Sequence, residues 1–290
     1  MQVSPVGGGF GLPVTPVVVF GRDSRETIDQ FAAAEGLKAA DVRARHAASG
    51  ILACGEAHGA GQLTLADNVI TTAAHVLFDE SGAPRAKVCV FKLTLTDGRE
   101  IRVPIDSSTI VAGSTDPYAV DAVHDWAVVK LKQPVDGPQP YRIADHVNLG
   151  AVEFAARGHV DWGDAKQLSL EKCKLWKQLA QSAEGTREFS FDCETGNGAS
   201  GGAVLSGEVG GALEAVLVGY RSIAPDSALP FSGKHYNFVV SVEGAFRQAA
   251  EKAAAPMTAS LAPVAKAPAS ASVPSPAAGQ EQRSVGSSDH

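Results

Sequence analysis

The chain has 290 residues, enough for one large domain or two small ones, and its hydrophobic content of 44% is ordinary for a globular protein. The formal net charge is −7 and no dense block of Lys and Arg occurs, so nothing indicates binding to nucleic acid or to an anionic membrane. No apolar run reaches the ~18 residues that a membrane-spanning helix needs.

The cysteines bear on the compartment in which the protein folds. There are four of them: Cys54, Cys89, Cys173 and Cys193. An even number is typical of two disulfides in an exported protein, whereas a cytosolic protein would keep four buried thiols. No Cys-x-x-Cys pair occurs, which argues against a structural zinc site. Residues 1–20 contain no Lys or Arg and make a poor signal peptide, so the predicted secreted or periplasmic location depends on the cysteines.

The first 48 residues differ from the rest of the chain. Residues 1–16 are rich in Gly and Pro and predict an irregular lead-in. The segment Gly21–Arg25 is a polar turn. Residues 25–48 are rich in Ala, Glu, Arg and Asp, with irregularly spaced apolar side chains, and predict one or two short helices outside the main domain. We therefore assign residues 1–48 to a lead-in with short helices.

From Gly50 onward, short β-prone runs alternate with turn residues, which favours a sandwich or a barrel. A first set of strands is predicted at Ile51–Cys54, Gln62–Leu65, Asn68–Thr72, Lys87–Thr96, Glu100–Val103, Thr109–Ala112 and Trp126–Leu131. A segment with three prolines, residues 132–148, then predicts a crossing between two units. A second set is predicted at Ala151–Arg157, Gln167–Trp176, Arg187–Cys193, Gly202–Leu205, Ala215–Tyr220 and Tyr236–Val240.

The end of the chain predicts a helix followed by a tail. Ser241–Lys252 has the pattern of a closing helix, with Ser241 as its N-cap and Glu243 near its positive end. Residues 255–290 are rich in Ala, Pro and Ser and contain no aromatic residue. Such a segment buries too little surface to offset the entropy of ordering, so we expect it to be disordered.

The stretch 196–202 carries the clearest chemical signal, because it places one serine, Ser200, among four glycines. Glycine allows positive φ and a close approach of the backbone to a ligand. A serine on such a loop can present its hydroxyl while neighbouring N–H groups converge, as a nucleophile with an oxyanion hole requires. Taken alone, the stretch fits a glycine-rich turn between two strands equally well.

Two upstream segments join this loop in the order His, Asp, Ser. The apolar run Val69–His75 ends in Ala-Ala-His, and Asp125–Leu131 begins with Asp before an apolar strand. The three pieces resemble the trypsin-like, chymotrypsin-fold serine peptidases, in which similar segments carry the base, the residue that orients it and the nucleophile. The spacing also suits that fold, since Asp125 lies 50 residues after His75 and Ser200 lies 75 residues after Asp125.

This resemblance, which covers roughly residues 17–250, implies an all-β fold. It implies two packed antiparallel six-stranded barrels within a peptidase domain at 49–254, the first at about 49–135 and the second at about 148–240, followed by the C-terminal helix. The Gly-x-Asp-x-Arg element at Gly21–Arg25 is similar to one that precedes the domain in bacterial glutamyl-endopeptidase-like proteins. The chain is therefore identified as a member of that branch.

The resemblance also implies the mechanism of a serine endopeptidase that acts through an acyl-enzyme. His75 is the general base, Asp125 orients it and Ser200 is the nucleophile, with the N–H groups of Gly198 and Ser200 as the oxyanion hole. The partner is a protein or peptide substrate, and no metal or organic cofactor is needed. Ala199 departs from the Asp of the common loop, so we do not expect activation by an α-ammonium buried at this position.

Each residue also has a simpler explanation. A histidine after a strand is often a core residue with satisfied hydrogen bonds, and an Asp at a strand end often caps a turn. The convergence of the three motifs favours the catalytic interpretation of His75 and Asp125. His124 is next to Asp125, but strand alternation would turn the two side chains to opposite faces.

Two other functions remain open at this point. The first is a catalytically degenerate peptide-binding module of the same fold. The second is an esterase of the α/β-hydrolase type, because residues 198–202 also match Gly-x-Ser-x-Gly. That family places its Asp and His after the Ser, and only His235 and His290 follow Ser200 here.

The peptidase interpretation extends to disulfides and specificity. From their closeness in sequence to the catalytic segments, we predict the pairs Cys54–Cys89 and Cys173–Cys193. Glutamyl endopeptidases pair a Thr five residues before the nucleophile with a His on a later strand. Thr195 matches the first, but no His lies between Ser200 and His235. Glu194 would instead favour a basic P1 residue, and we expect no strong preference for Glu at P1.

Overall fold

The computed structural model describes residues 19–157, 168–207, 211–224 and 227–256. The predicted lead-in at 1–16 and the predicted disordered tail, from residue 257 on, lie outside the described residues. In the part of the chain that is described, no helix is long and apolar enough to cross a membrane.

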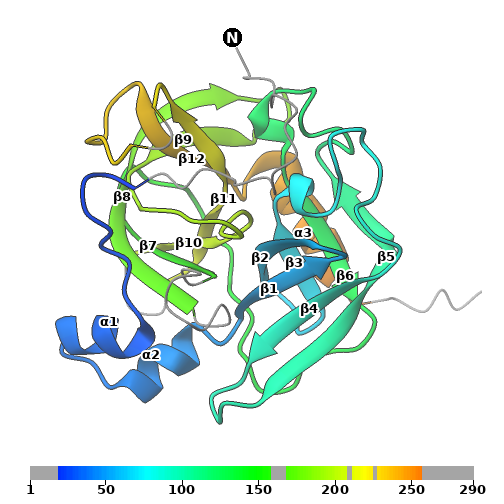
Figure 1. Cartoon of the computed structure of the whole chain (residues 1–290). Coiled ribbons are helices and arrows are strands. Elements are labelled where there is room, and N and C mark those ends of the chain that lie inside the picture. The colour runs from blue at the N-terminus through cyan, green and yellow to red at the C-terminus, as the bar shows by residue number, and fades with distance from the viewer. Residues whose placement is uncertain (1–18, 158–167, 208–210, 225–226, 257–290) are drawn as a thin grey trace, which may run out of the picture. The chain divides into compact units, whose positions relative to one another are not determined.

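The first barrel is closed by six antiparallel strands in the order β1-β2-β3-β6-β5-β4 (Figure 1). They are β1 (Ser49–Cys54), β2 (Ala57–Leu63), β3 (Val69–Thr72), β4 (Cys89–Thr94), β5 (Glu100–Ala112) and β6 (Ala127–Leu131). Two short 3₁₀ helices interrupt the loops, η1 (Ala74–Val76) after β3 and η2 (Ala122–His124) before β6. Because β3 and β6 are neighbours, the end of one lies beside the start of the other, with Thr72 opposite Ala127.

The second barrel is closed in the order β10-β11-β12-β9-β8-β7. Its strands are β7 (Gly150–Arg157), β8 (Leu168–Gln181), β9 (Arg187–Phe191), β10 (Ala203–Ser206), β11 (Leu213–Ser222) and β12 (His235–Ser241). Both barrels belong to one compact unit of the chain. The predicted all-β fold of two six-stranded barrels is confirmed. Within the described residues the named strands of both barrels pair in antiparallel fashion, which rules out the parallel, doubly wound sheet of an α/β-hydrolase.

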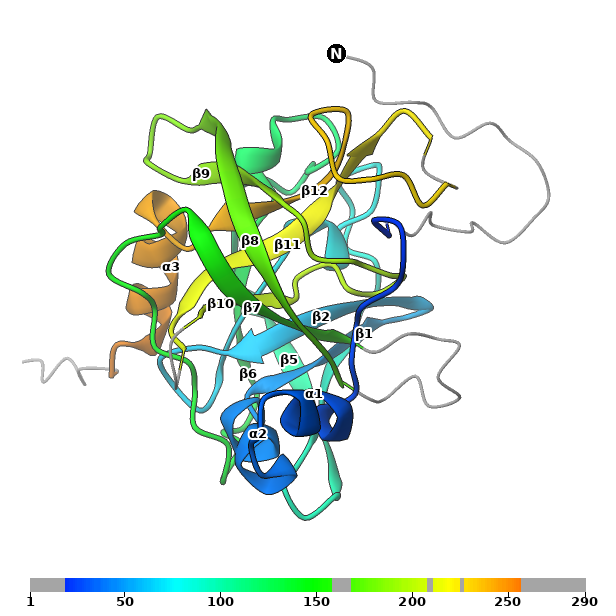
Figure 2. The same ribbon diagram turned by 90° about the vertical axis from the view of Figure 1, so that its left-hand side faces the viewer.

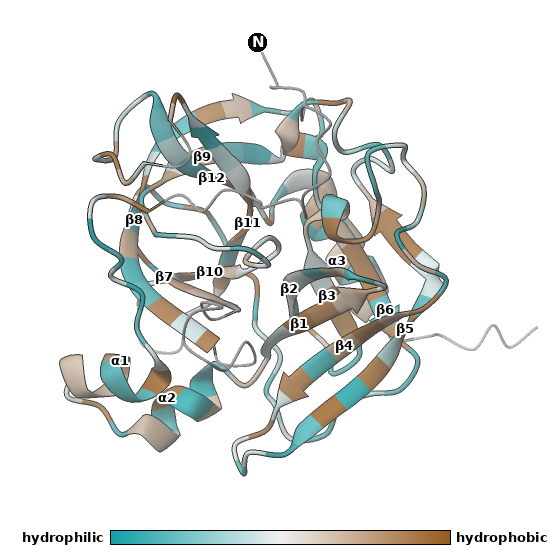
Figure 3. Cartoon of the chain, viewed as in Figure 1, coloured by the Kyte–Doolittle hydropathy of each residue, from teal (hydrophilic) through white to brown (hydrophobic). Residues whose placement is uncertain are grey.

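The strands form where apolar and polar residues alternate or where apolar residues run together. Figure 3 shows alternating hydrophobic and hydrophilic bands along β5 and β8, which each have one face toward a barrel interior. The strands β3 and β6 are mostly apolar, and Val69, Ile70, Val128 and Val129 are fully buried. Burying each such side chain contributes about 1.5–3 kcal/mol, so these two strands form the inner wall of the first barrel.

One predicted strand break is wrong. Glu100–Val103 and Thr109–Ala112 are the two ends of a single strand, β5, with a register shift between Asp106 and Val111. The polar residues at this irregularity satisfy one another locally, since the Asp106 carboxylate accepts from the N–H and hydroxyl of Ser108 at 3.1 and 2.6 Å. The Thr109 hydroxyl replaces a backbone acceptor for Lys130 N, at 2.9 Å. A bulge of this kind bends a strand without ending it.

Three α-helices flank the barrels (Figure 2). Helices α1 (Ile28–Ala34) and α2 (Ala39–Arg45) pack against each other, and Thr27 forms a capping box at the start of α1. Helix α3 (Gly244–Ala254) follows the second barrel in sequence but packs on β3 and β6 of the first. The Phe246 ring stacks on Trp126 with centroids 4.9 Å apart, so the helix joins the two halves of the chain.

The predicted start of this last helix is wrong. Ser241 still belongs to β12, opposite Ala215 of β11, and its hydroxyl accepts from Arg187 N at 2.9 Å. Helix α3 begins three residues later, after Glu243, because strand pairing satisfies the Ser241 backbone before a helix can use it.

Candidate active site

His75 lies in η1, directly after β3, where Ala73 and Ala74 are fully buried. These two small residues let the chain turn sharply at the edge of the first barrel. The His75 side chain stays 18% exposed and is therefore accessible on one side.

Asp125 follows η2 and lies two residues before β6, so it precedes an apolar strand. Its Oδ2 lies 2.7 Å from His75 Nδ1, and its Oδ1 accepts from the His75 backbone N–H at 2.9 Å. Both oxygens of a carboxylate that is only 8% exposed are thus bound by one residue. In the neutral ring this arrangement favours the tautomer with its proton on Nδ1, so that Nε2 carries the lone pair. His124 belongs to η2, so strand alternation does not govern where its side chain points.

Sequence analysis missed two residues beside His75. Arg85 Nε donates to the His75 carbonyl oxygen at 2.8 Å, and its Nη2 donates to the Tyr118 hydroxyl at 2.8 Å. The Tyr118 ring lies edge-on to the imidazole with centroids 6.1 Å apart. Burial raises the pKa of Tyr118, so the hydroxyl stays protonated at neutral pH. No motif marks these residues, since they meet His75 only through the folding of two loops.

Ser200 lies on the loop before β10, and this loop needs glycine at two positions with left-handed backbone, Gly198 (φ 82°) and Gly201 (φ 84°). Gly202 N donates to the Ala199 carbonyl at 2.8 Å, and Gly201 N donates to Leu217 O at 2.7 Å. The half-buried Ser200 is therefore held between a tight turn and strand β11. Among the described residues, neither Gly198 N nor Ser200 N has a protein acceptor, so both N–H groups remain available to a ligand.

The loop packs directly against the first barrel. Ser200 O accepts from Ala60 N of β2 at 2.7 Å, and Ala60 O accepts from the Thr72 hydroxyl at 2.7 Å. A Cβ atom on Gly201 would lie 2.2 Å from Ala60 O and 3.1 Å from Ala73 N. The backbone at Ser200 and Gly201 is thus in contact with the segment that leads into His75. Within the described chain no hydrogen bond joins the Ser200 hydroxyl to the His75 ring, and such bonds are often long before substrate binds.

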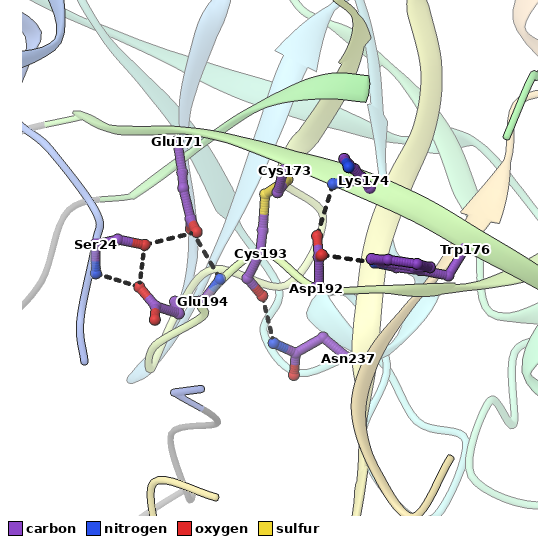
Figure 4. Close-up of a disulfide and its surroundings, with 9 residues drawn as sticks. All are labelled: Ser24, Glu171, Cys173, Lys174, Trp176, Asp192, Cys193, Glu194 and Asn237. Atoms are coloured by element: carbon purple, nitrogen blue, oxygen red, sulfur yellow. Dashed lines mark hydrogen bonds between the residues drawn. A yellow bond between two sulfur atoms is a disulfide. The ribbon is translucent and has the colours of Figure 1, made fainter. Parts of the chain in front are cut away.

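The two predicted specificity residues face different partners. Thr195 donates to Asn237 Oδ1 at 3.3 Å, and Asn237 in turn donates to Cys193 O at 2.6 Å. The carboxylate of Glu194 faces the other way and accepts from the backbone N–H and the hydroxyl of Ser24 (Figure 4). Glu194 is 3% exposed, so its charge is buried against the N-terminal segment and not presented beside Thr195.

Both predicted disulfides are confirmed. Cys54–Cys89 joins directly opposed residues of β1 and β4 in the first barrel. Cys173–Cys193 joins β8 to the segment that follows β9, one residue before Glu194 (Figure 4). Each barrel therefore carries one bridge. Such bridges are consistent with an extracellular or periplasmic protein.

A cavity of about 540 Å³ lies elsewhere, between the helices α1 and α2 and the strands β1 and β4, and no triad candidate lines it. One wall is the buried His46, whose Nε2 lies 2.5 Å from Glu153 Oε1. This contact ties the end of helix α2 to β7 of the second barrel. In the part of the chain described, no group of three or more His, Cys, Asp or Glu side chains is arranged to hold a metal ion.

Comparisons with known proteins agree with this fold. The family model of the trypsin-like peptidase domain matches residues 59–213, just over half of the chain. A search of curated proteins found no match.

Among solved structures, a Glu endopeptidase in complex with MPD superposes with a TM-score of 0.59 at 14% identity, over 82% of this chain and 100% of that one. A thermostable serine protease, AL20, from an extremophilic microorganism gives a TM-score of 0.51 at 16% identity, over 73% of this chain and 98% of that one. At these identities the likeness concerns the fold alone. With its two closed barrels and the matching family model, the chain belongs to the trypsin-like peptidases and has the fold of the chymotrypsin-like serine peptidases.

Proposed function

We propose that the protein is an active serine endopeptidase in which His75, Asp125 and Ser200 form the catalytic triad. The observation that carries the proposal is the pair of hydrogen bonds that His75 donates to Asp125, at 2.7 and 2.9 Å, which support a fixed orientation and tautomer of the proposed base. The loop of Ser200 is anchored to β2 beside that base. Available N–H groups at Gly198 and Ser200 add the donors that an oxyanion requires.

The proposed reaction uses these groups in sequence. Ser200 Oγ attacks the carbonyl carbon of the peptide, and His75 Nε2 accepts the hydroxyl proton. The developing oxyanion accepts hydrogen bonds from Gly198 N and Ser200 N. The C–N bond then breaks as His75 returns the proton to the leaving amine, which leaves an acyl ester on Ser200. Water, deprotonated by His75, hydrolyses this ester and regenerates the serine. Asp125 stabilises the imidazolium in both halves by accepting the hydrogen bond from Nδ1.

The decisive experiment is labelling of the intact protein with a fluorophosphonate, which reacts with an activated serine. We expect stoichiometric labelling that Ser200→Ala abolishes, with hydrolysis of a peptide ester lost in the same variant. A folded wild-type protein that does not label would support a degenerate peptide-binding module. Labelling that persists in Ser200→Ala would assign the nucleophile to another residue.

Specificity is a second part of the proposal. The hydroxyl of Thr195 contacts Asn237, and Asn237 is an amide that carries no positive charge for an acidic side chain. The Glu194 carboxylate is occupied by Ser24, so it does not offer a negative charge for a basic side chain either. We therefore expect neither Glu nor Lys and Arg to dominate at P1. The check is a peptide library profiled by cleavage site, and a profile dominated by cleavage after Glu would contradict this expectation.

The compartment follows from the chemistry of the bridges. We infer that the protein works outside the cytosol, secreted or in a periplasm, because two disulfides persist in an oxidising environment. Its partner there is a protein or peptide substrate.

A further inference from the structure

The segment that precedes helix α1 runs along the second barrel and reaches the loop of Ser200. Glu26 and Leu170 of β8 form a two-way backbone bridge, with both N–H···O distances at 2.9 Å. At the other end of the segment, the Phe20 ring packs edge-on against His235 at 5.3 Å between centroids. The residues between these anchors, Asp23, Ser24 and Arg25, lie against residues 194–196.

Arg25 is the most constrained side chain of this segment. Its Nε and Nη2 donate to the two carboxylate oxygens of Asp23 at 2.9 and 2.6 Å, which is the bidentate geometry of a strong ion pair. Only 1% of the side chain is exposed. The third nitrogen, Nη1, lies where a side chain of Gly196 would be, since a Cβ atom there would be 2.6 Å from it. The Nη1 end of the guanidinium therefore fills the space beside Gly196 that a side chain would take.

Gly196 begins the turn that carries the proposed oxyanion donors. Its carbonyl oxygen accepts from Ala199 N at 2.9 Å, and this bond closes a turn around Gly198. A shift of Gly196 therefore moves the Gly198 N–H, and catalytic donors lose much of their effect when displaced by about 1 Å. The Arg25 guanidinium stands behind the first residue of that turn and limits such a shift.

Ser24 holds the same loop from the neighbouring position. Its hydroxyl lies 2.8 Å from Glu194 Oε2 and 3.0 Å from Glu171 Oε1, and the Glu194 N–H donates to Glu171 Oε2 at 2.8 Å (Figure 4). One hydroxyl proton cannot serve two ionised carboxylates. All contacts are satisfied when Glu171 is protonated and donates to Ser24 Oγ, while Ser24 donates to an ionised Glu194. Burial, together with the charge of Glu194, raises the pKa of Glu171 to about 8, in agreement with this arrangement.

We propose that Arg25 is a positioning residue for the oxyanion loop, and that the segment Asp23–Glu26 is a clasp that holds residues 194–198 in their reactive conformation. This inference rests on the proposed serine peptidase function, because it assigns a role to the loop of that site. The clasp touches neither the substrate nor the reacting atoms, and it acts through the backbone of Gly196 and the carboxylate of Glu194.

The test compares Arg25→Ala with Arg43→Ala, a matched control in which an arginine paired to Asp29 is removed from an exposed helix of the same region. Both purified full-length variants are checked by circular dichroism and thermal melting. We expect Arg25→Ala to lower kcat for a peptide ester by about 30–300-fold with KM changed less than about threefold, since the loss is confined to the transition state. Arg43→Ala keeps the wild-type kcat, and Arg25→Lys, which retains the charge, recovers part of the loss.

A second pair of variants tests the contact itself. A methyl group at Gly196 pushes against Arg25 Nη1, so Gly196→Ala should lower kcat in the wild-type background. In Arg25→Ala the obstructing group is gone, and adding Gly196→Ala should cost little more. This non-additivity is the signature of direct contact. It also covers the case in which Arg25→Ala alone does not fold, because Gly196→Ala keeps the arginine and its ion pair.

Hydrogen exchange separates a failure of this inference from a failure of the proposed function. We expect exchange of the amides in residues 194–201 to be faster in Arg25→Ala by about tenfold or more, whether or not the protein is catalytic. If the wild type does not react with a fluorophosphonate but exchange is faster in Arg25→Ala, the clasp is supported and the proposed peptidase function is refuted. A folded Arg25→Ala with wild-type kcat and unchanged exchange overturns the clasp.

Discussion

The two halves of the proposed active site are held in different ways. His75 and Asp125 both come from the first barrel, and they bind each other directly because β3 and β6 are neighbouring strands. The loop of Ser200 is held by β11 of its own barrel and also from outside that barrel, by Ala60 of β2 and by Ser24, which is 170 residues from Glu194 in sequence. The proposed base is therefore positioned by the register of one barrel, whereas the proposed nucleophile also depends on contacts between parts of the chain that are far apart.

The largest effect comes from removing one reacting group of either half. We expect His75→Ala and Ser200→Ala each to lower kcat by about 10⁶-fold, and the double variant to be no worse than either, because the two residues act as a unit. Neither change removes a buried anchor, so the melting temperature should stay near that of the wild type. The measurement is peptide-ester hydrolysis with thermal melting. Losses that simply multiply in the double variant would show that the two halves act independently.

The next effect isolates the orienting residue of the first half. Asp125→Asn keeps the size of the side chain but replaces one acceptor oxygen by an NH₂ group. In the wild type both oxygens accept from His75, so in the variant one His75 donor would face another donor. The ring is then stabilised in the wrong tautomer, and we expect kcat to fall by about 10⁴-fold. The pH profile of kcat/KM is the check. A loss below about tenfold would mean that the backbone of η1 alone orients the base.

The two disulfides sharpen the comparison, because each barrel has one. Their partners are 35 and 20 residues apart, so removing either bridge by a pair of Cys→Ser changes should lower the free energy of unfolding by about 3–4 kcal/mol. The effect on kcat should differ between the two bridges. Loss of Cys54–Cys89 leaves the kcat of the folded protein unchanged, whereas loss of Cys173–Cys193 lowers it by about tenfold because Cys193 adjoins Glu194. Urea unfolding and kcat at low temperature measure both, and equal kcat values would contradict the contrast.

The smallest effect concerns the pH dependence of stability at the clasp. The charged groups that face Glu171 are the Glu194 carboxylate and the Arg25 guanidinium, and Asp23 in turn faces Glu194. Its folded pKa of about 8 lies above its ordinary value of 4.5. Between these values the folded state keeps a proton that the unfolded chain has lost, so its contribution to stability is complete below about pH 4.5 and is lost as the pH rises toward 8.

Glu171→Gln removes the titrating carboxyl group while keeping the shape of the side chain. We expect the variant to gain about 1–3 kcal/mol on the wild type between pH 5 and pH 8, as measured by urea unfolding at both values. Lys172→Gln, a change at the exposed neighbour, serves as the control and should show no such change. A wild-type and Glu171→Gln pair with parallel pH dependence would show that Glu171 is ionised throughout.

Much of this protein was predictable from sequence because its signals are local. Alternating apolar residues set the strands, and the order of Ala-Ala-His, Asp and Gly-x-Ser-Gly-Gly identified the triad candidates before any contact was known. The cysteine pairs followed from their positions beside those motifs. The predictions were wrong where a tertiary contact overrode a local pattern. Ser241 has the pattern of a helix N-cap, but it stays in β12 because the neighbouring strand β11 pairs with its backbone.

Only the tertiary structure decided which segments that are far apart in the sequence contact one another. The sequence of residues 57–61 has little β propensity, yet it forms the first part of β2, because Gly59 must pass within contact of Val76 and of Ser200 O. Glu194 could be placed beside the nucleophile by counting residues, but its partner Ser24 is 170 positions away and determines where its charge points. Local patterns specify which elements form, whereas the direction of a buried polar side chain depends on whichever distant group can satisfy it.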